Sequence, residues 1–209
     1  MGCHSRSRHN VRMRHSLQDE IAAVAARYVV EEGLEYGLSK RRAIKELGLP
    51  ARAALPSNEL VEEAVREHLA IFCAATHPQE LAVLRRLARI WMVRLAEFRP
   101  HLGGAVWRGT ATRHSDIYLQ LFCDDPKSAE IGLIDQRVRF EVSTVTGFQG
   151  EEVDALTVVL PCPEFGQNVL LHLMIYDHDD LRGALKVDAN GRSWRGGLTA
   201  LDALMGGDV

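Results

Sequence analysis

Apolar residues recur every three or four positions through the first hundred residues, which is the spacing of amphipathic helices. The first such pattern follows Ser16, runs from Ile21 to Val29 and is expected to form a capped helix that ends near Gly33. Three further patterns, over residues 37–47, 57–74 and 78–98, are bounded by serine, glycine or proline, as helix ends commonly are. The first half of the chain is therefore predicted to be helical.

The pattern changes after Pro100, where β-branched residues alternate with polar ones between glycine, proline and aspartate. This alternation predicts strands over residues 105–108, 116–123, 138–145, 153–160 and 169–176, with a short helix beginning at Pro126 and a weak helix in LTALDALM. Helices first and a mixed sheet afterwards indicate an α+β fold. We expect a helical subdomain over residues 15–100 and an α+β domain over residues 101–209.

Composition narrows the class of protein. Hydrophobic residues make up 46% of the chain and charged residues 25%, and no apolar run approaches the ~20 residues that span a bilayer. We therefore expect a cytoplasmic protein with no membrane partner. The net charge of −3 argues against binding nucleic acid by bulk electrostatics. The four cysteines show no C-x-x-C spacing, so they suggest neither a disulfide framework nor a zinc site.

The first fifteen residues depart from this composition, with four arginines, three histidines and no acidic residue. They also lack the apolar run of a signal peptide. Residues 1–14 are interpreted either as a disordered basic arm or as a mis-assigned start upstream of Met13.

Candidate chemistry lies after the change in pattern, where the turn Gly109-Thr110 precedes Asp116 at the beginning of an apolar strand. Residues two apart on a strand point to one face, so carboxylates at such positions converge, and a neighbouring strand can add another. Converging carboxylates hold the Mg²⁺ ions used in phosphoryl transfer. A glycine turn lets backbone N–H groups approach phosphates.

The stretch from Gly104 to Asp125 resembles the core of the nucleotidyltransferase superfamily, which has a DNA polymerase beta-like fold, and resembles a divergent bacterial member with an incomplete Asp-x-Asp motif. The resemblance implies that Asp116 is the first carboxylate and that Tyr118 stands where the second would be. It also implies that Glu141 supplies the third carboxylate from the neighbouring strand.

The same resemblance implies a catalytic Mg²⁺ site formed by Asp116 and Glu141. The activity would be transfer of a nucleotidyl group from a nucleoside triphosphate to a hydroxyl of a small molecule, RNA or protein. The residues expected to bind this substrate gather around the turn: Gly109, Thr110, Arg108, Arg113 and Ser115. Arginine suits this role because its planar fork matches phosphate oxygens.

Other interpretations stay open. Tyr118 is also consistent with a lost metal site in a protein that binds a nucleotide or a partner without catalysis. Asp116 can instead cap a turn while Glu141 faces solvent. The basic helix over residues 37–47, with Arg41 and Arg42, is a third candidate surface for RNA or an acidic partner.

Two further motifs have plain structural interpretations. His172, within the last expected strand, is interpreted as a core or sheet-face histidine, and the acidic run 177–180 as a cap between strand and turn. The sequence contains no G-x-x-x-x-G-K-[ST] motif, so it gives no support for ATP-dependent ligase chemistry.

Overall fold

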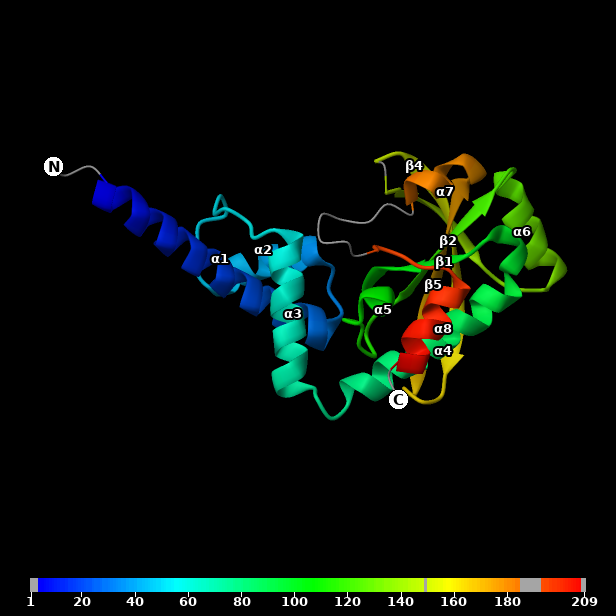
Figure 1. Ribbon diagram of the computed structural model, residues 1–209, viewed down its shortest axis with the longest axis horizontal. Helices are drawn as coiled ribbons and strands as arrows, with labels where there is room; N and C mark the ends of the chain where they lie inside the picture. Colours follow the sequence, from blue (N-terminus) through cyan, green and yellow to red (C-terminus); the bar gives the residue numbers. More distant parts are fainter. Residues whose placement is uncertain (1–3, 149, 185–192, 208–209) are drawn as a thin grey trace. The chain divides into compact units, whose positions relative to one another are not determined.

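The computed structural model describes residues 4–148, 150–184 and 193–207 (Figure 1). The chain divides into two compact units, Met1–His77 and Pro78–Val209. The predicted boundary at residue 100 is therefore not where the units divide. The reason is α4 (His77–Arg94), whose buried face, with Leu84, Ala88 and Met92, packs in the same core as the sheet.

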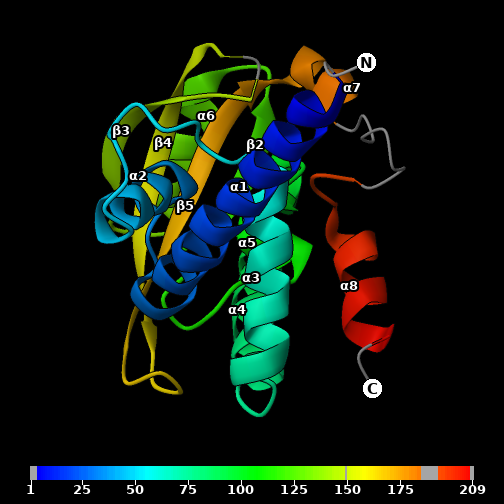
Figure 2. The same ribbon diagram turned by 90° about the vertical axis from the view of Figure 1, so that its left-hand side faces the viewer.

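The first unit contains α1 (His4–Glu32), α2 (Tyr36–Glu46) and α3 (Asn58–Phe72), with α1 lying beside both of the others (Figures 1 and 2). Its core brings together aliphatic side chains from the three helices: Ile21, Ala22, Ala25, Ala26, Val30, Ala43, Ile44, Val61, Val65 and Leu69. The Ser57 hydroxyl caps α3 by accepting a hydrogen bond from the Leu60 amide at 3.1 Å. The helical prediction for this part of the chain is confirmed.

The beginning of α1 differs from the prediction. Residues 4–14 form its first turns instead of a disordered arm, and Ser16 lies inside the helix instead of capping it. Residues 1–3 lie outside the described part of the chain. The prediction from composition is wrong here because residues 4–20 contain no proline or glycine that would end the helix. The helix therefore extends from its packed part toward the N-terminus, as far as His4.

The second unit is built on a five-stranded sheet in the order β1-β2-β5-β4-β3. The strands are β1 (His101–Gly103), β2 (Ile117–Cys123), β3 (Glu141–Thr146), β4 (Glu152–Cys162) and β5 (Gln167–Asp177). The β2 and β5 strands are parallel and the other neighbours antiparallel, so the sheet is mixed. Figure 2 shows β3, β4, β5 and β2 in this order. The predicted α+β class is confirmed.

The remaining elements of this unit are short. They are η1 (Ala96–Phe98), α5 (Gly104–Arg108), α6 (Pro126–Asp135), η2 (His178–Asp180), α7 (Leu181–Ala184) and α8 (Leu198–Gly207). Asp125 caps α6, since its carboxylate accepts a hydrogen bond from the Lys127 amide at 2.9 Å. Asp177 caps η2 in the same way, by accepting from the Asp179 amide at 2.8 Å. The predicted acidic cap after the last strand is confirmed.

Alternation along the strands gives the sheet two different faces. One face packs Ile117, Leu119 and Leu121 of β2 into a core shared with α4, α6 and α8. The other face carries the intervening residues of β2, β5 and β4: Tyr118, Gln120, Phe122, His172, Met174, Tyr176 and Thr157. We refer to this second surface as the site face.

The strand predicted over residues 105–108 is wrong, because these residues belong to α5. The strand lies earlier, at His101–Gly103. Gly104 adopts φ of 67° and ends that strand, while Gly109, at φ of 77°, ends the helix. Both values are in the left-handed region that glycine enters without steric cost. No helix among the described residues is long and apolar enough to cross a bilayer.

Candidate functional site

A row of five residues crosses the site face, one from each strand of the sheet. Gly103 of β1 pairs with Tyr118 of β2, and Tyr118 pairs with His172 of β5. His172 pairs with Thr157 of β4, which in turn pairs with Glu141 of β3. Residues opposite each other on neighbouring strands place their side chains on the same face. The row therefore joins two residues that the sequence had singled out, Tyr118 and Glu141, through His172.

Asp116, one residue before β2, is bonded to the centre of this row. Its Oδ2 lies 3.3 Å from His172 Nε2, and His172 Nδ1 lies 3.0 Å from the Thr157 hydroxyl. A carboxylate only accepts, so Nε2–H donates to Asp116 and the Thr157 hydroxyl donates to Nδ1 when the imidazole is neutral. The Tyr118 ring stacks on the imidazole with centroids 4.9 Å apart. The interpretation of His172 as a sheet-face histidine is confirmed.

The expected position of Glu141 on the strand next to Asp116 is wrong. In the sheet, β5 and β4 lie between β2 and β3. At ~4.8 Å per strand, three steps separate the two backbones by about 14 Å. Mg²⁺ binds oxygen at ~2.0–2.1 Å, so these two carboxylates are too far apart to share one ion.

The residues present therefore do not fit the implied Mg²⁺ centre. Tyr118 replaces one carboxylate, and Glu141 is three strands away from Asp116. Among residues 4–148, 150–184 and 193–207, no three or more histidine, cysteine or acidic side chains gather closely enough to hold a metal ion. Asp116 remains 37% exposed, so its second oxygen is open to solvent or to a ligand.

The glycine that contacts the row is Gly104 instead of Gly109. A Cβ on Gly104 would lie 3.3 Å from Cδ2 of Tyr118, so this turn approaches the tyrosine ring closely. Gly109 lies at the other end of α5, near Arg85, and Thr110 is only 2% exposed. The pair Gly103-Gly104 between strand and helix was the sequence signal for this turn.

The other residues expected to bind substrate lie at varied places around this turn. Arg113 forms an ion pair with Glu80 at 3.7 Å and lies over the Phe165 ring. The Arg108 guanidinium lies 5.8 Å from the Trp194 ring centroid. The Ser115 hydroxyl accepts a hydrogen bond from the Thr112 amide at 3.0 Å and so stabilises the turn before Asp116.

Sequence reasoning missed a second group on the site face, formed by Gln120 and Arg195. Gln120 is 8% exposed, and its Oε1 is buried with no hydrogen-bond partner among residues 4–148, 150–184 and 193–207. The same is true of Nε and Nη1 of Arg195, whose guanidinium lies 4.4 Å from the Phe148 ring centroid. Buried polar atoms without partners are costly, which marks these groups as candidates for ligand contacts. The sequence feature that could have indicated this group is Gln120, the one glutamine within the apolar strand IYLQLFC.

Arg195 is held at the edge of the sheet by its neighbours in sequence. Leu102 and Gly196 exchange two backbone hydrogen bonds of 2.9 and 3.0 Å, which extends the sheet beyond β1. The Trp107 indole donates a hydrogen bond to the Ser193 carbonyl at 2.8 Å. The Cβ of Arg195 consequently lies next to Gly103, at the end of the row.

Burial is the main cause of the pKa shifts of Arg195 and of two residues near it, His101 and Tyr176. Burial lowers the pKa of Arg195, although the nearby Tyr176 opposes the shift. Burial also lowers the pKa of His101, and the charge of Arg195 adds to that effect. The pKa of Tyr176 rises to about 12 through burial, with a contribution from the Glu151 carboxylate. An anion close to Arg195 would offset the burial of its charge.

Comparison with known proteins gives little further information. No protein-family model and no curated protein matches the chain. Among solved structures, the chain is similar to the Cid1 poly(U) polymerase with MgGTP bound, at 14% identity and a TM-score of 0.34. The match covers 53% of this chain and 38% of that chain. A similarity this distant assigns neither an activity nor a substrate.

Proposed function

We propose that this protein is a catalytically degenerate, nucleotidyltransferase-like module that binds a nucleotide on the site face without transferring it. The arrangement around Asp116 supports the loss of catalysis. Tyr118 stacks on His172 where a second carboxylate would be needed, and the imidazole already occupies one Asp116 oxygen. Two-metal phosphoryl transfer requires ions roughly 3.5–4 Å apart, held by converging carboxylates. Asp116 and Glu141 do not converge, because two strands lie between β2 and β3.

The observation that carries the binding proposal is the set of buried polar atoms on Gln120 and Arg195 that find no hydrogen-bond partner in the described part of the chain. They lie on the same face as Asp116 and His172. A nucleotide offers what these atoms lack, because its base supplies N–H donors for an amide oxygen and its phosphates supply acceptors for a guanidinium. Each bond made to such a group removes a desolvation cost of about 1–3 kcal/mol.

Nucleoside triphosphates are the ligand class that we propose. Of the residues expected from the sequence, Arg108 and Ser115 remain candidates for contacts with the phosphates. Gly109 and Thr110 are weaker candidates, since Thr110 is buried and Gly109 ends α5. Since Asp116 and Glu141 do not form a metal site together, binding should not require Mg²⁺.

Calorimetric titration of ATP, GTP, CTP and UTP tests this proposal, each with Mg²⁺ and with EDTA. We expect at least one nucleotide to bind in both conditions, with the affinity reduced about tenfold in Gln120→Leu and in Arg195→Met, equivalent to one lost hydrogen bond to a buried group. Arg86→Ala is the matched control, because this arginine pairs with Glu164 on the surface of the same unit at 2.6 Å.

Two results would overturn the proposal in different ways. Pyrophosphate release from any nucleotide that needs Mg²⁺ and is abolished by Asp116→Asn would show an active transferase. Absence of binding to all four nucleotides, with and without Mg²⁺, would show that the site face is not a nucleotide site.

A further inference from the structure

A hollow in the first unit combines cationic and apolar side chains, and it lies beside the second half of α2. Its volume is about 490 Å³. The lining residues come from α2 and from the segment that follows it: Arg41, Ile44, Lys45, Leu49, Ala51, Arg52, Ala53 and Leu55. We refer to it as the α2 pocket. Small-molecule sites commonly measure ~300–1,000 Å³, so the pocket is large enough for one.

The cations of the α2 pocket have no counter-ion among the residues that the structure describes. Within the described part of the chain, the side chains of Arg41, Lys45 and Arg52 form no hydrogen bond or ion pair. The neighbouring basic residue of the same helix behaves differently. Arg42 is paired with Glu32 and lies 4.4 Å from the centroid of the Tyr28 ring.

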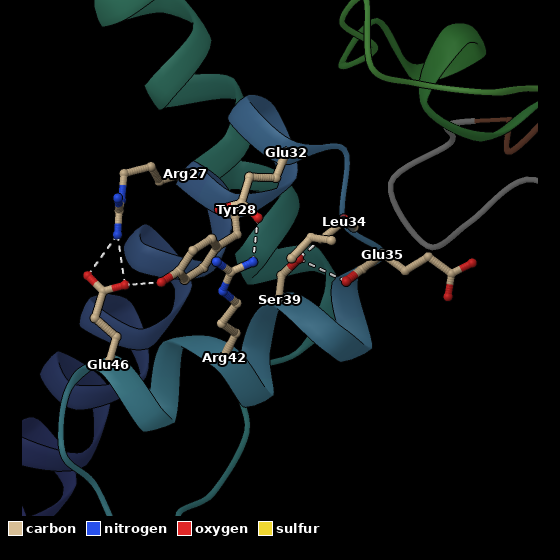
Figure 3. Close-up of polar contacts among 8 residues, drawn as sticks. All are labelled: Arg27, Tyr28, Glu32, Leu34, Glu35, Ser39, Arg42 and Glu46. Carbon is tan, nitrogen blue, oxygen red and sulfur yellow. Dashed lines mark hydrogen bonds and ion pairs between the residues drawn. The ribbon is translucent and has the colours of Figure 1, made fainter. Parts of the chain in front are cut away.

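Figure 3 shows where two acidic residues, Glu46 and Glu32, point. Glu46 accepts two hydrogen bonds from Arg27, at 2.7 and 2.8 Å, and another from the Tyr28 hydroxyl. Glu32 faces Arg42. Glu46 and Glu32 are therefore committed to the contact between α1 and α2, whereas the Glu35 carboxylate points away from the side chains drawn. The basic face predicted for this helix divides into a paired half and an unpaired half.

The apolar part of the pocket is held in place by backbone hydrogen bonds. The Leu49 amide donates to the Ile44 carbonyl at 3.0 Å, and the Ala53 amide donates to the Pro50 carbonyl at 2.8 Å. Leu55 nevertheless remains 45% exposed, while Ile44 is 5% exposed at the pocket floor. Covering the exposed part of Leu55 would be favourable at about 25 cal/mol per Å² of apolar surface.

We propose that the α2 pocket binds a small organic anion that has an apolar body. Its carboxylate or phosphate would lie against Arg41, Lys45 and Arg52, and its aliphatic or aromatic part against Ile44 and Leu55. This site lies wholly in the first unit and is independent of the nucleotide site proposed for the second.

Calorimetric titration of the full chain with hexyl phosphate and hexanoate tests the proposal, with hexyl glucoside as the neutral comparison. We expect one or both anions to bind and the neutral compound not to bind. Which anion binds more tightly identifies phosphate or carboxylate as the preferred group. The double variant R41Q/K45Q should weaken the anions at least tenfold, because two charge-assisted contacts are lost.

Three further variants complete the test. Arg42→Gln is the matched control, since it removes a basic residue of the same helix that lies outside the pocket, and it should leave the affinity unchanged. Leu55→Ser keeps all three cations and should still weaken binding, which separates a built pocket from loose attraction to positive charge. Arg195→Met should not alter this binding, so failure here is distinguishable from failure at the site face.

Equal binding of hexyl glucoside would overturn the proposal, as would unchanged affinity in R41Q/K45Q with a normal far-ultraviolet circular dichroism spectrum. Binding of an acidic, leucine-containing peptide without binding of either hexyl anion would assign the pocket to a protein partner instead.

Discussion

Replacing Gly196 with alanine should destabilise the second unit strongly, because there is no space for a side chain beneath Trp107. A Cβ at this position would lie 2.1 Å from Cη2 of the indole and 2.4 Å from Cζ3. Carbon atoms pack at ~3.5–4.0 Å, so the ring or the backbone must move by roughly 1.4 Å or more. Neither moves freely, since the indole is bonded to the Ser193 carbonyl and Gly196 to Leu102.

The expected cost follows from these contacts. Overpacking of this kind costs about 1–3 kcal/mol, and loss of the indole hydrogen bond adds about 1 kcal/mol. Urea unfolding followed by tryptophan fluorescence measures it, because Trp91, Trp107 and Trp194 all lie in the second unit. At an m-value of ~2 kcal/mol/M, the unfolding midpoint should fall by about 1–2 M.

A matched control for Gly196→Ala is available in the same unit. Gly206, within α8, has no atom within 4 Å of an added Cβ, so Gly206→Ala should be neutral or slightly stabilising. Adding Trp107→Leu to Gly196→Ala should recover part of the loss by making room. A Gly196→Ala protein whose free energy of unfolding lies within about 0.5 kcal/mol of the original would refute the steric reasoning.

Three other substitutions test separate parts of the structure. Burial lowers the pKa of His101, so between the folded and unfolded pKa values the unfolded chain binds more protons, and stability falls as the pH drops below ~6.5. Urea unfolding at pH 7.5 and at pH 5 should show a smaller loss of stability in His101→Gln than in the original protein, and an unchanged pH dependence would contradict this. Gly104→Ala should lower the free energy of unfolding by about 1–2 kcal/mol in the same assay, since Gly104 has a φ of 67° that alanine adopts only with strain. A variant with the wild-type unfolding midpoint would contradict this expectation. Glu46→Gln should weaken the contact between α1 and α2 by no more than about 1 kcal/mol, because both partners of the pair with Arg27 are about 40% exposed (41% and 39%); a double-mutant cycle with Arg27→Gln measures the coupling, and a value of zero would show that the pair contributes nothing.

The sequence predicted the elements of the fold better than their arrangement. Helical spacing located α2, α3 and α4, and alternation located β2, β4 and β5 closely. One error lies where glycine decides the outcome. Residues 105–108 have a composition suited to a strand, but the left-handed conformations of Gly104 and Gly109 confine them to one turn of helix.

The sequence predicted only part of the candidate site, because it indicates the faces of strands but not their order in the sheet. Period-two alternation shows which residues share a face, so it indicated correctly that Asp116, one residue before β2, and Tyr118, within β2, lie on the same side of the sheet. It does not show which strands are neighbours. The order of the sheet separates Glu141 from Asp116 and brings in His172 instead. Arg195 lies in a loop whose composition gave no signal, and it reaches the site only because Gly196 pairs with Leu102.

The two groups on the site face differ in a way that decides between catalysis and binding. The Asp116, His172 and Thr157 side chains are linked by two hydrogen bonds, and Asp116 remains 37% exposed, so no buried charge in this half of the face requires a metal ion. Within the part of the chain that the structure describes, the buried side-chain atoms Oε1 of Gln120 and Nε and Nη1 of Arg195 have no such partners. Folding alone does not offset the desolvation cost of burying those atoms, whereas hydrogen bonds to a ligand with donors and anionic oxygens would offset it. A ligand on this face would therefore lie beside a carboxylate that already accepts a hydrogen bond from His172, which supports the proposal that a nucleotide is bound without being transferred.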